Sequence, residues 1–224
     1  MGTNVQLFDL SQPFDRDIPV YHIYSRPTFG VYHEIDQGGF YDRTVSFYTH
    51  SGTHIDAPRH FSKDGYNLAQ IPLEVLISSG VVLDLPKKKL EEITADDFEK
   101  AKSRIDIRAG DVVIINTGWH RKWKEPDYAK NFPGIVRSGA EWLVKSGIKM
   151  VGVDWICIDH PKQTDMGDNS WASHKIVLSA NIPVIENIGG EVDKISGKRV
   201  TIMALPIKVV EGDGFPIRVA AAVE

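Results

Sequence analysis

The chain has 224 residues, of which 42% are hydrophobic and 25% carry a charge, as in an ordinary soluble globular protein. This length fits one large α/β domain over residues 1–224. The formal net charge of −4 gives no reason to expect nucleic acid or an anionic membrane as a partner, so both are set aside.

The first half of the chain predicts four strands and one helix. Residues 6–14 and 44–52 alternate apolar and polar positions and carry β-branched or aromatic side chains, as strands do. Residues 80–86 and 110–118 are continuous apolar runs, which are typical of strands buried on both faces. Between these runs, residues 94–104 predict a helix, because the segment opens with a threonine suited to the N-cap and has acidic residues in its first turn.

The second half continues the mixture of helices and strands. Residues 134–147 have apolar residues at helical spacing and end on a glycine, which is a natural helix stop. Residues 148–159 return as a buried strand, and residues 169–181 predict a further helix that begins near Asn169 or Ser170. More strands are expected at residues 182–188, 199–209 and 213–223. This pattern predicts an α/β domain with a mixed sheet and flanking helices.

Three features bear on the cellular compartment. Cys157 is the only cysteine and lies in an apolar run, so no internal disulfide is possible and we expect a buried thiol. The first ten residues lack the charged segment and apolar core of a signal peptide. No stretch approaches the roughly 18 apolar residues of a membrane span. A cytoplasmic location is therefore expected.

One short stretch, HSGTHIDAPRH at residues 50–60, holds three of the chain's eight histidines and an aspartate. Gly52 and Pro58 disfavour a helix there. In an extended chain, residues of the same parity share a face, so the four polar side chains would all point the same way. These side chains belong to His50, His54, Asp56 and His60.

Distances along a strand limit how these side chains can meet. At about 3.3 Å per residue, His54 and Asp56 lie about 6.6 Å apart and can share one ion, whereas His50 would lie about 13 Å from His54. The chain must therefore curl between the two histidines, for which Gly52 is suited. Neutral imidazoles with a carboxylate match zinc or manganese. A polar turn with surface histidines is the alternative.

The stretch resembles the signature His-x-Gly-Thr-His-x-Asp-x-Pro-x-His of the Putative cyclase family of metal-dependent hydrolases, which includes bacterial kynurenine formamidases and isatin hydrolases. Every fixed position of the signature is matched. Other segments similar to the family follow along nearly the whole chain: DLSQPFDRDIPVY, INTGW, FPGIVRSGAEWLVKSGI, GVDWICIDH and SHKIVLSANIPVIENI. The resemblance implies a swivelling β/β/α fold and a homo-oligomer, either a dimer or a tetramer.

The resemblance also implies a set of metal ligands. By position in the family pattern, His50 and His54 would bind one metal ion, and Asp56 would bridge two. His174 would bind the second ion, and Glu186 would complete the pair. The implied cofactor is Zn²⁺, with Mn²⁺ as the alternative, at one or two ions per subunit.

Two further roles follow from the same resemblance. His60 would be the general acid/base, and Tyr21 would stand where kynurenine formamidases carry a substrate-contacting tryptophan. The tyrosine, together with the segment GVDWICIDHPKQTD, departs from the family pattern and leaves the substrate open.

The remaining histidines and the tryptophans have no motif support as ligands. His22, His33 and His120 are expected on the surface or in loops, whereas His160 follows a strand end and could line the pocket. Most of the tryptophans are expected in the core, because large aromatic side chains dominate cores.

The predicted function is a metal-dependent hydrolase that cleaves a C–N amide bond of a small aryl-formamide or cyclic amide. A metal-activated water would attack the carbonyl, and His60 would hand a proton to the leaving nitrogen. Two alternatives stay open. One is a hydrolase of a lactone or cyclic ester with the same metal site. The other is a catalytically silent metal-binding oligomeric scaffold. The presence of His60 argues against this alternative, because a scaffold needs no acid/base beside its metal ions.

Overall fold

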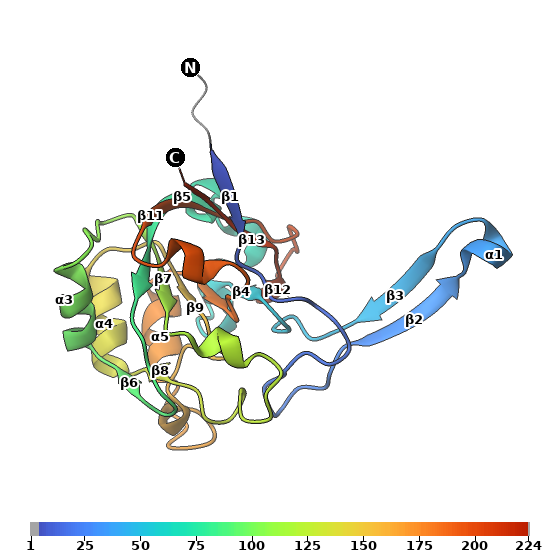
Figure 1. Ribbon diagram of the computed structural model, residues 1–224. Helices are drawn as coiled ribbons and strands as arrows, with labels where there is room; N and C mark the ends of the chain where they lie inside the picture. Colours follow the sequence, from blue (N-terminus) through green and yellow to red (C-terminus); the bar gives the residue numbers. More distant parts are fainter. Residues whose placement is uncertain (1–4, 224) are drawn as a thin grey trace.

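A computed structural model describes residues 5–223, which are built around one curled sheet of nine strands (Figure 1). The strand order is β1-β13-β11-β5-β7-β9-β10-β4-β12. The bounds are β1 Gln6–Asp9, β4 His54–Asp56, β5 Ile77–Asp84, β7 Val112–Asn116, β9 Met150–Val153, β10 Val184–Glu186, β11 Arg199–Ala204, β12 Gly214–Pro216 and β13 Val219–Val223. The pairs β5–β7, β7–β9 and β9–β10 are parallel and the others are antiparallel, so the predicted mixed sheet is confirmed.

The central strands are buried on both faces, which explains their continuous apolar sequences. In β5, Val81 and Leu83 belong to one hydrophobic core, and Val82 between them belongs to the other. In β7, Val113 likewise faces the first core and Ile114 the second. Side chains of a strand alternate between faces, so both faces need a cover.

Three helices cover one face and form the first core with it (Figure 1). They are α3 Ala95–Lys102, α4 Arg137–Lys145 and α5 Ala172–Ser179. The predicted start of α3 is confirmed, because the Asp97 carboxylate accepts hydrogen bonds from the backbone N–H and hydroxyl of Thr94. The predicted stop after α4 is also confirmed, at Gly147 with φ 69°. The predicted cap of α5 was one or two residues early, because the N-cap is Trp171, with φ 49°.

The second core lies inside the curl of the sheet. Phe8 of β1, at one edge, shares this core with Ile55 of β4 near the other edge. A bridge between Ser11 and Ile188 connects the segment after β1 to the segment after β10. The curl therefore brings segments from distant parts of the chain to the edge that β4 and β12 form.

A two-stranded arm projects from the sheet (Figure 1). It consists of β2 Thr28–His33, the short helix α1 Ile35–Gly38 and β3 Asp42–Ser46. The strand predicted at residues 44–52 ends at Ser46, and the arm as a hairpin was not predicted.

Other predicted strands are shorter in the structure. Residues 148–159 are a strand only as far as Val153, and residues 199–209 only as far as Ala204. Residues 213–223 form two strands, β12 and β13. The remaining short elements are η1 Pro58–His60, η2 Leu68–Gln70, α2 Leu73–Leu76, β6 Glu92–Ile93, η3 Trp119–Lys122, β8 Gly134–Ile135, η4 Pro161–Gln163 and η5 Val192–Ile195. Within residues 5–223, none of the helices has the length and apolar character that a membrane crossing requires.

Candidate metal centre

The histidine-rich stretch at residues 50–60 is curled, not extended throughout. Gly52 has φ 65°, in the left-handed region that glycine adopts without strain, and a Cβ there would lie 2.8 Å from the Phe14 ring. Only His54–Asp56 is a strand, and Pro58–His60 forms a 3₁₀ turn. The predicted curl between His50 and His54 is confirmed, and a second turn at Pro58–His60 adds to the convergence of the side chains.

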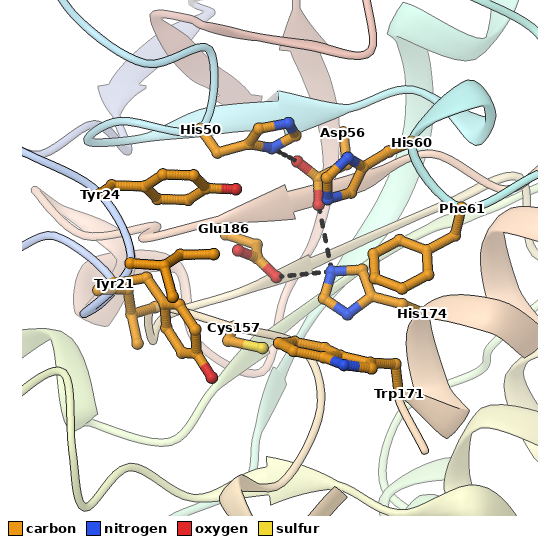
Figure 2. Close-up of a pocket in the computed structure, with 12 residues that line it drawn as sticks. Tyr21, Tyr24, His50, Asp56, His60, Phe61, Cys157, Trp171, His174 and Glu186 are labelled. Carbon is orange, nitrogen blue, oxygen red and sulfur yellow. Dashed lines mark hydrogen bonds and ion pairs between the residues drawn. The ribbon is translucent and has the colours of Figure 1, made fainter. Parts of the chain in front are cut away.

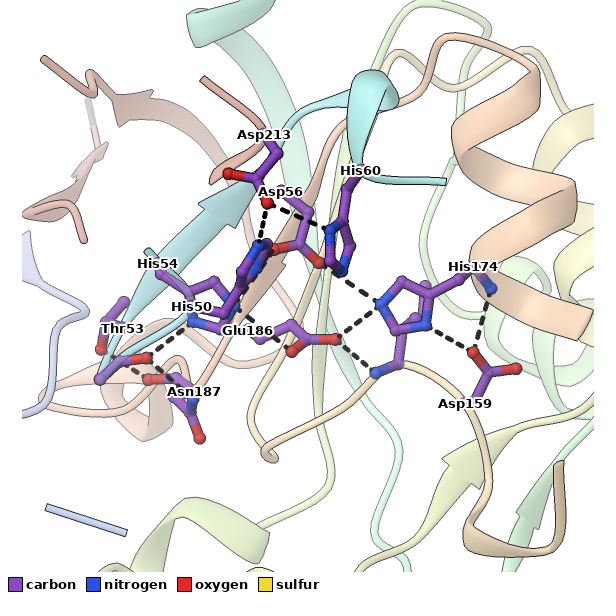
Figure 3. A network of polar contacts seen from close by, with 12 residues as sticks. His50, Thr53, His54, Asp56, His60, Asp159, His174, Glu186, Asn187 and Asp213 are labelled. Atoms are coloured by element: carbon purple, nitrogen blue, oxygen red, sulfur yellow. Dashed lines mark hydrogen bonds and ion pairs between the residues drawn. The ribbon is translucent and has the colours of Figure 1, made fainter. Parts of the chain in front are cut away.

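The sheet sets the neighbours of this stretch. β4 lies between β10 and β12, with Glu186 paired opposite His54 and Gly214 opposite Asp56. Glu186 is thereby held beside the motif despite the long separation in sequence. The loop residue Asp213 arrives from the other side, next to Asp56 (Figure 3).

The Asp56 carboxylate lies among three imidazoles. Its Oδ1 is 2.6 Å from Nδ1 of His50 and 3.1 Å from Nε2 of His54. Its Oδ2 is 3.4 Å from Nε2 of His174, on helix α5. Oδ1 thus faces His50 and His54, whereas Oδ2 faces His174.

The Glu186 carboxylate also lies between His54 and His174. Its Oε2 is 3.5 Å from Nε2 of His54, and its Oε1 is 3.5 Å from Nε2 of His174. Oε1 also accepts a 2.6 Å hydrogen bond from the backbone N–H of Ile158, which fixes the side chain (Figure 3). Two carboxylates that each face both histidines are the arrangement that two adjacent cations need.

The second nitrogen of each of these histidines contacts an oxygen outside the set. Nδ1 of His54 is 2.9 Å from the carbonyl oxygen of Gly52, and Nδ1 of His174 is 2.5 Å from Oδ2 of Asp159. These contacts orient each ring with Nδ1 outward, so Nε2, which faces Asp56 and Glu186, is the nitrogen that an ion among these carboxylates would bind.

These residues fit a divalent transition metal. Nε2 of His54 and Oδ2 of Asp56 are buried and have no hydrogen-bond partner among the described residues. Burial alone would raise the pKa of Asp56, but the imidazoles of His50 and His54 hold that pKa well below its ordinary value. Burial would lower the pKa of His50, yet Asp56 and Asp213 raise it to about 10. The carboxylates therefore make this point strongly attractive to positive charge.

Three sets of potential ligand atoms lie within 4.8 Å of one another in the described part of the chain: His50, Asp56 and His60; His54, Asp56 and Glu186; and Cys157, Asp159 and His174. His60 thus lies close enough to be a ligand as well as an acid/base. Its Nδ1 is 3.4 Å from Oδ2 of Asp213, and burial lowers its pKa. Its predicted role as acid/base stays a prediction.

A cavity of about 180 Å³ opens onto the centre (Figure 2). It is lined by Tyr21, Ile23, Tyr24, His50, Asp56, His60, Phe61, Ile156, Cys157, Trp171, His174 and Glu186. The Tyr21 hydroxyl donates a 2.5 Å hydrogen bond to Asp165, and its ring meets Trp171 edge to face at 6.1 Å. The ring of Tyr24 is nearly parallel to that of His50. The walls of the cavity are thus mostly aromatic, and the histidines and carboxylates of the centre form its polar base.

The structure corrects several expectations about residues near the centre. His160 does not line the cavity, because its Nε2 faces the carbonyl oxygen of Leu90. His120 is buried rather than superficial, with Nδ1 2.8 Å from Oδ2 of Asp154. Trp171 lines the cavity, although tryptophans were expected in the core.

Sequence reasoning also missed contributors to the centre. Tyr24, Phe61 and Trp171 carry no motif, and aromatic residues are common in cores. Asp159 was expected only as part of the strand end near the pocket, and Asp213 was assigned no role. The signal that could have found Asp213 is an Asp-Gly pair at the start of a strand, where the aspartate lies directly before the strand and its carboxylate beside it.

Comparisons with known proteins agree with this geometry. The family model described as Putative cyclase matches residues 8–160. A kynurenine formamidase of Bacillus anthracis is 26% identical over 212 residues, which cover 94% of this chain and 94% of the relative. A structure from Bacillus stearothermophilus described as a predicted metal-dependent hydrolase is 26% identical, with a TM-score of 0.78, over 98% of this chain and 99% of that one. Isatin hydrolase A from Ralstonia solanacearum has a TM-score of 0.88 at 23% identity, over 99% of this chain and 93% of that one.

The fold and the centre define an enzyme, a metal-dependent hydrolase. Because the family model spans more than half of the residues, the chain belongs to the Putative cyclase family. The expected fold class is confirmed with it, since the curled mixed sheet and its few flanking helices match those of the structural neighbours.

Proposed function

We propose that this enzyme hydrolyses the C–N bond of a small aromatic amide, either a cyclic amide or an aryl-formamide. The observation that carries the proposal is the position of the centre. Two carboxylates, Asp56 and Glu186, each face His54 and His174 directly beneath an aromatic cavity. The kynurenine formamidase relative acts on an amide of this kind, as its name says.

The centre would hold one or two ions, zinc or manganese. His50, His54 and Asp56 would hold the first, and Asp56, His174 and Glu186 the second. When bound, such an ion supplies Lewis acidity, which polarises a carbonyl and lowers the pKa of water.

The residues of the chain supply the remaining chemistry. Tyr24, Phe61 and Trp171 offer ring faces and edges that bind a flat substrate and exclude water from the cavity. Nδ1 of His60 faces Asp213, so Nε2 is the nitrogen left to transfer a proton to the leaving amide nitrogen. Burial lowers the pKa of His60, which favours the neutral imidazole that must first accept that proton.

The lining favours an uncharged substrate. None of the described residues that line the cavity is lysine or arginine. A carboxylate on the substrate would therefore have no cationic partner beneath the aromatic walls, and burying it unpaired would be costly. A neutral bicyclic amide suits this cavity better than an amide that carries an amino-acid group.

A hydrolysis panel tests the proposal. Protein loaded with zinc or manganese is assayed with isatin-like lactams, aryl-formamides, N-formylkynurenine and a lactone. We expect turnover of the neutral aromatic amides, loss of turnover on chelation and recovery when the metal is returned. Turnover of the lactone alone would support the cyclic-ester alternative, and no turnover of any compound would contradict the proposal.

We also propose that the protein is a homo-oligomer. The arm supports this, because Tyr32, Ile35 and Phe40 expose 70%, 64% and 51% of their surface. A two-stranded hairpin on its own is marginally stable in water, so an apolar arm of this kind gains from a partner surface. The cytoplasmic location and the single-domain organisation stay predictions.

A further inference from the structure

We propose that Asp213 is a positioning residue that holds two histidines at once, His50 as a metal ligand and His60 as the acid/base. This inference rests on the proposed function for the role of His60. It assigns a single carboxylate, outside the histidine-rich stretch, to both metal retention and turnover.

The backbone fixes Asp213 beside the centre. Its carbonyl oxygen accepts a 2.8 Å hydrogen bond from the N–H of Ala57, directly after β4. The next residue, Gly214, pairs with Asp56 and has no room for a side chain, since a Cβ there would lie 2.6 Å from the His50 ring. On the side chain, Oδ1 accepts a 3.2 Å hydrogen bond from the Thr49 hydroxyl. Both the main chain and the carboxylate are thus held in place.

The other carboxylate oxygen orients the His50 ring. Oδ2 of Asp213 lies 3.0 Å from Nε2 of His50 and accepts the N–H of that nitrogen. This orientation directs Nδ1 toward Asp56, whose Oδ1 is 2.6 Å away, so an ion bound between His50 and Asp56 would replace the proton on Nδ1. A carboxylate behind a ligand histidine raises the basicity of the imidazole and fixes its orientation.

The same oxygen also faces His60. Oδ2 of Asp213 lies 3.4 Å from Nδ1 of His60, and the His50 and His60 rings are 4.0 Å apart with 31° between their planes (Figure 3). One atom therefore orients two neighbouring rings. Its loss would free the ligand and the acid/base together.

An ordinary surface ion pair does not account for Asp213. The side chain is 42% exposed, yet among residues 5–223 its ion-pair partners are the two histidines, with no lysine or arginine. An exposed carboxylate is normally free to turn toward solvent, whereas this one is directed inward by three hydrogen-bonding groups.

The chain offers a matched control in Asp193. That side chain is 41% exposed and also lies 3.4 Å from a buried histidine, His120. Its other partners are Arg121 and Asn116, and none of these residues belongs to the centre. Asp193→Asn therefore repeats the chemical change without touching the centre.

Two of the measurements need no substrate. In the first, metal-free wild type, Asp213→Asn, Asp213→Ala and Asp193→Asn are titrated with Zn²⁺ against a chromophoric chelator. We expect zinc to bind about 10- to 100-fold more weakly to both Asp213 variants and with wild-type affinity to the control. In the second, nitrogen NMR of the zinc-loaded proteins reads the protonated nitrogen of His60, assigned with His60→Ala. We expect Nδ1–H in the wild type and the control, and loss of that preference in the Asp213 variants.

The third measurement is kcat at saturating zinc, which should stay below that of the wild type in both Asp213 variants and recover in part in Asp213→Glu. Melting temperatures of all variants show that each is folded. Unchanged zinc affinity, an unchanged His60 tautomer, or full recovery of kcat at saturating zinc would each overturn the shared role. A wild type that hydrolyses nothing in the panel contradicts the proposed function alone, because the zinc and NMR measurements still decide the position of Asp213.

Discussion

Each histidine of the predicted metal-ligand set has one ring nitrogen directed toward Asp56 or Glu186, and its other ring nitrogen contacts an oxygen atom from outside that set. It comes from a carbonyl group for His54 and from an aspartate for His50 and His174. These contacts select the nitrogen that is free to bind an ion, which the ligand residues alone do not determine. The centre is therefore a set of pairs, each made of a ligand and the group that orients it.

His60→Ala separates its two candidate roles. If His60 is an acid/base, kcat should fall by about 10²- to 10⁴-fold. Zinc content, measured by elemental analysis, should stay at the wild-type level. Wild-type turnover would remove His60 from the mechanism, and lost zinc would make it a ligand.

Asp56→Ala and His174→Ala distinguish a bridging ligand from a terminal one. Asp56 has one oxygen toward His50 and His54 and the other toward His174, so its loss should weaken both metal positions. His174→Ala should weaken the second position more than the first. Metal titration of both variants checks this, and equal, mild losses would contradict a bridged pair.

Tyr21→Ala should raise KM for the preferred substrate much more than it lowers kcat, because a wall contact made equally in ground and transition states is uniform binding. Tyr21→Phe is the matched control, since it keeps the ring and removes only the hydrogen bond to Asp165. Steady-state kinetics on both variants test the role. An unchanged KM in Tyr21→Ala for every substrate hydrolysed would make Tyr21 a packing residue.

Among single residues, the sequence predicted the candidate metal ligands, but it did not predict the aspartates that orient them. The motif brings His50, His54 and Asp56 together within seven residues, so local spacing was enough. Asp159 and Asp213 come from distant segments, and a lone aspartate after a strand or in a turn has many ordinary explanations. Only the register of β4 with β12 makes the position of Asp213 specific.

Among the elements, the arm differs most from the rest of the molecule. Its strands β2 and β3 pair with each other and belong to no larger sheet. All five residues of β3 are exposed, including Val45. Strand patterns normally indicate which face is buried, but here only Phe29 at the base of β2 meets another part of the described chain, the Phe14 ring.

Replacing residues 28–46 with a short glycine-containing turn tests the oligomer proposal. If the arm forms the contact, the wild type should have a mass of at least twice the 25.0 kDa of the full chain, and the shortened variant a monomer mass somewhat below 25.0 kDa. Light scattering coupled to gel filtration measures this. An oligomer that survives the deletion would place the contact elsewhere, and a monomeric wild type would contradict the oligomer itself.

Helices and central strands were well predicted, and the arm was not, for one physical reason. The local sequence of a buried strand such as β7 indicates its burial through a continuous apolar run. The local sequence of a helix such as α3 indicates where it begins through its capping residues. The pairing of β2 with β3 depends on a turn through a short helix at Ile35–Gly38. The glycine pair Gly38-Gly39 marks a turn there, with Gly39 at φ 74°, but it does not specify that the two flanking segments pair with each other.

In the molecule as a whole, the centre joins parts that are far apart in the chain. β4, β10, β12 and α5 all contribute a residue or a neighbour to it. The order of strands that achieves this includes crossovers between non-consecutive strands, which local patterns do not specify. The fold class could therefore be predicted from the sequence, whereas the edge of the sheet that carries the centre could not.

Metal removal should lower the melting temperature, because an ion that binds only the folded chain stabilises it. At a free zinc concentration 100 times Kd, the stabilisation is about 2.7 kcal/mol, or about 5–11 °C for a chain of this size. Thermal scans with and without chelator measure the difference, with His174→Ala as a variant in which it should shrink. Identical melting curves would mean that the centre holds no ion under those conditions.

The single thiol at the back of the cavity has a practical consequence. Cys157 is 4% exposed, and burial raises its pKa to about 12, so at neutral pH it is protonated and shielded. The sulfur lines the cavity together with Tyr21 and Trp171, so an alkylating reagent reaches it through the space that a substrate would fill. Since the chain has no other cysteine, the mass of the adduct reports on this one position. A compound that occupies the cavity should therefore slow the alkylation of Cys157, and mass spectrometry can read that protection without any added label.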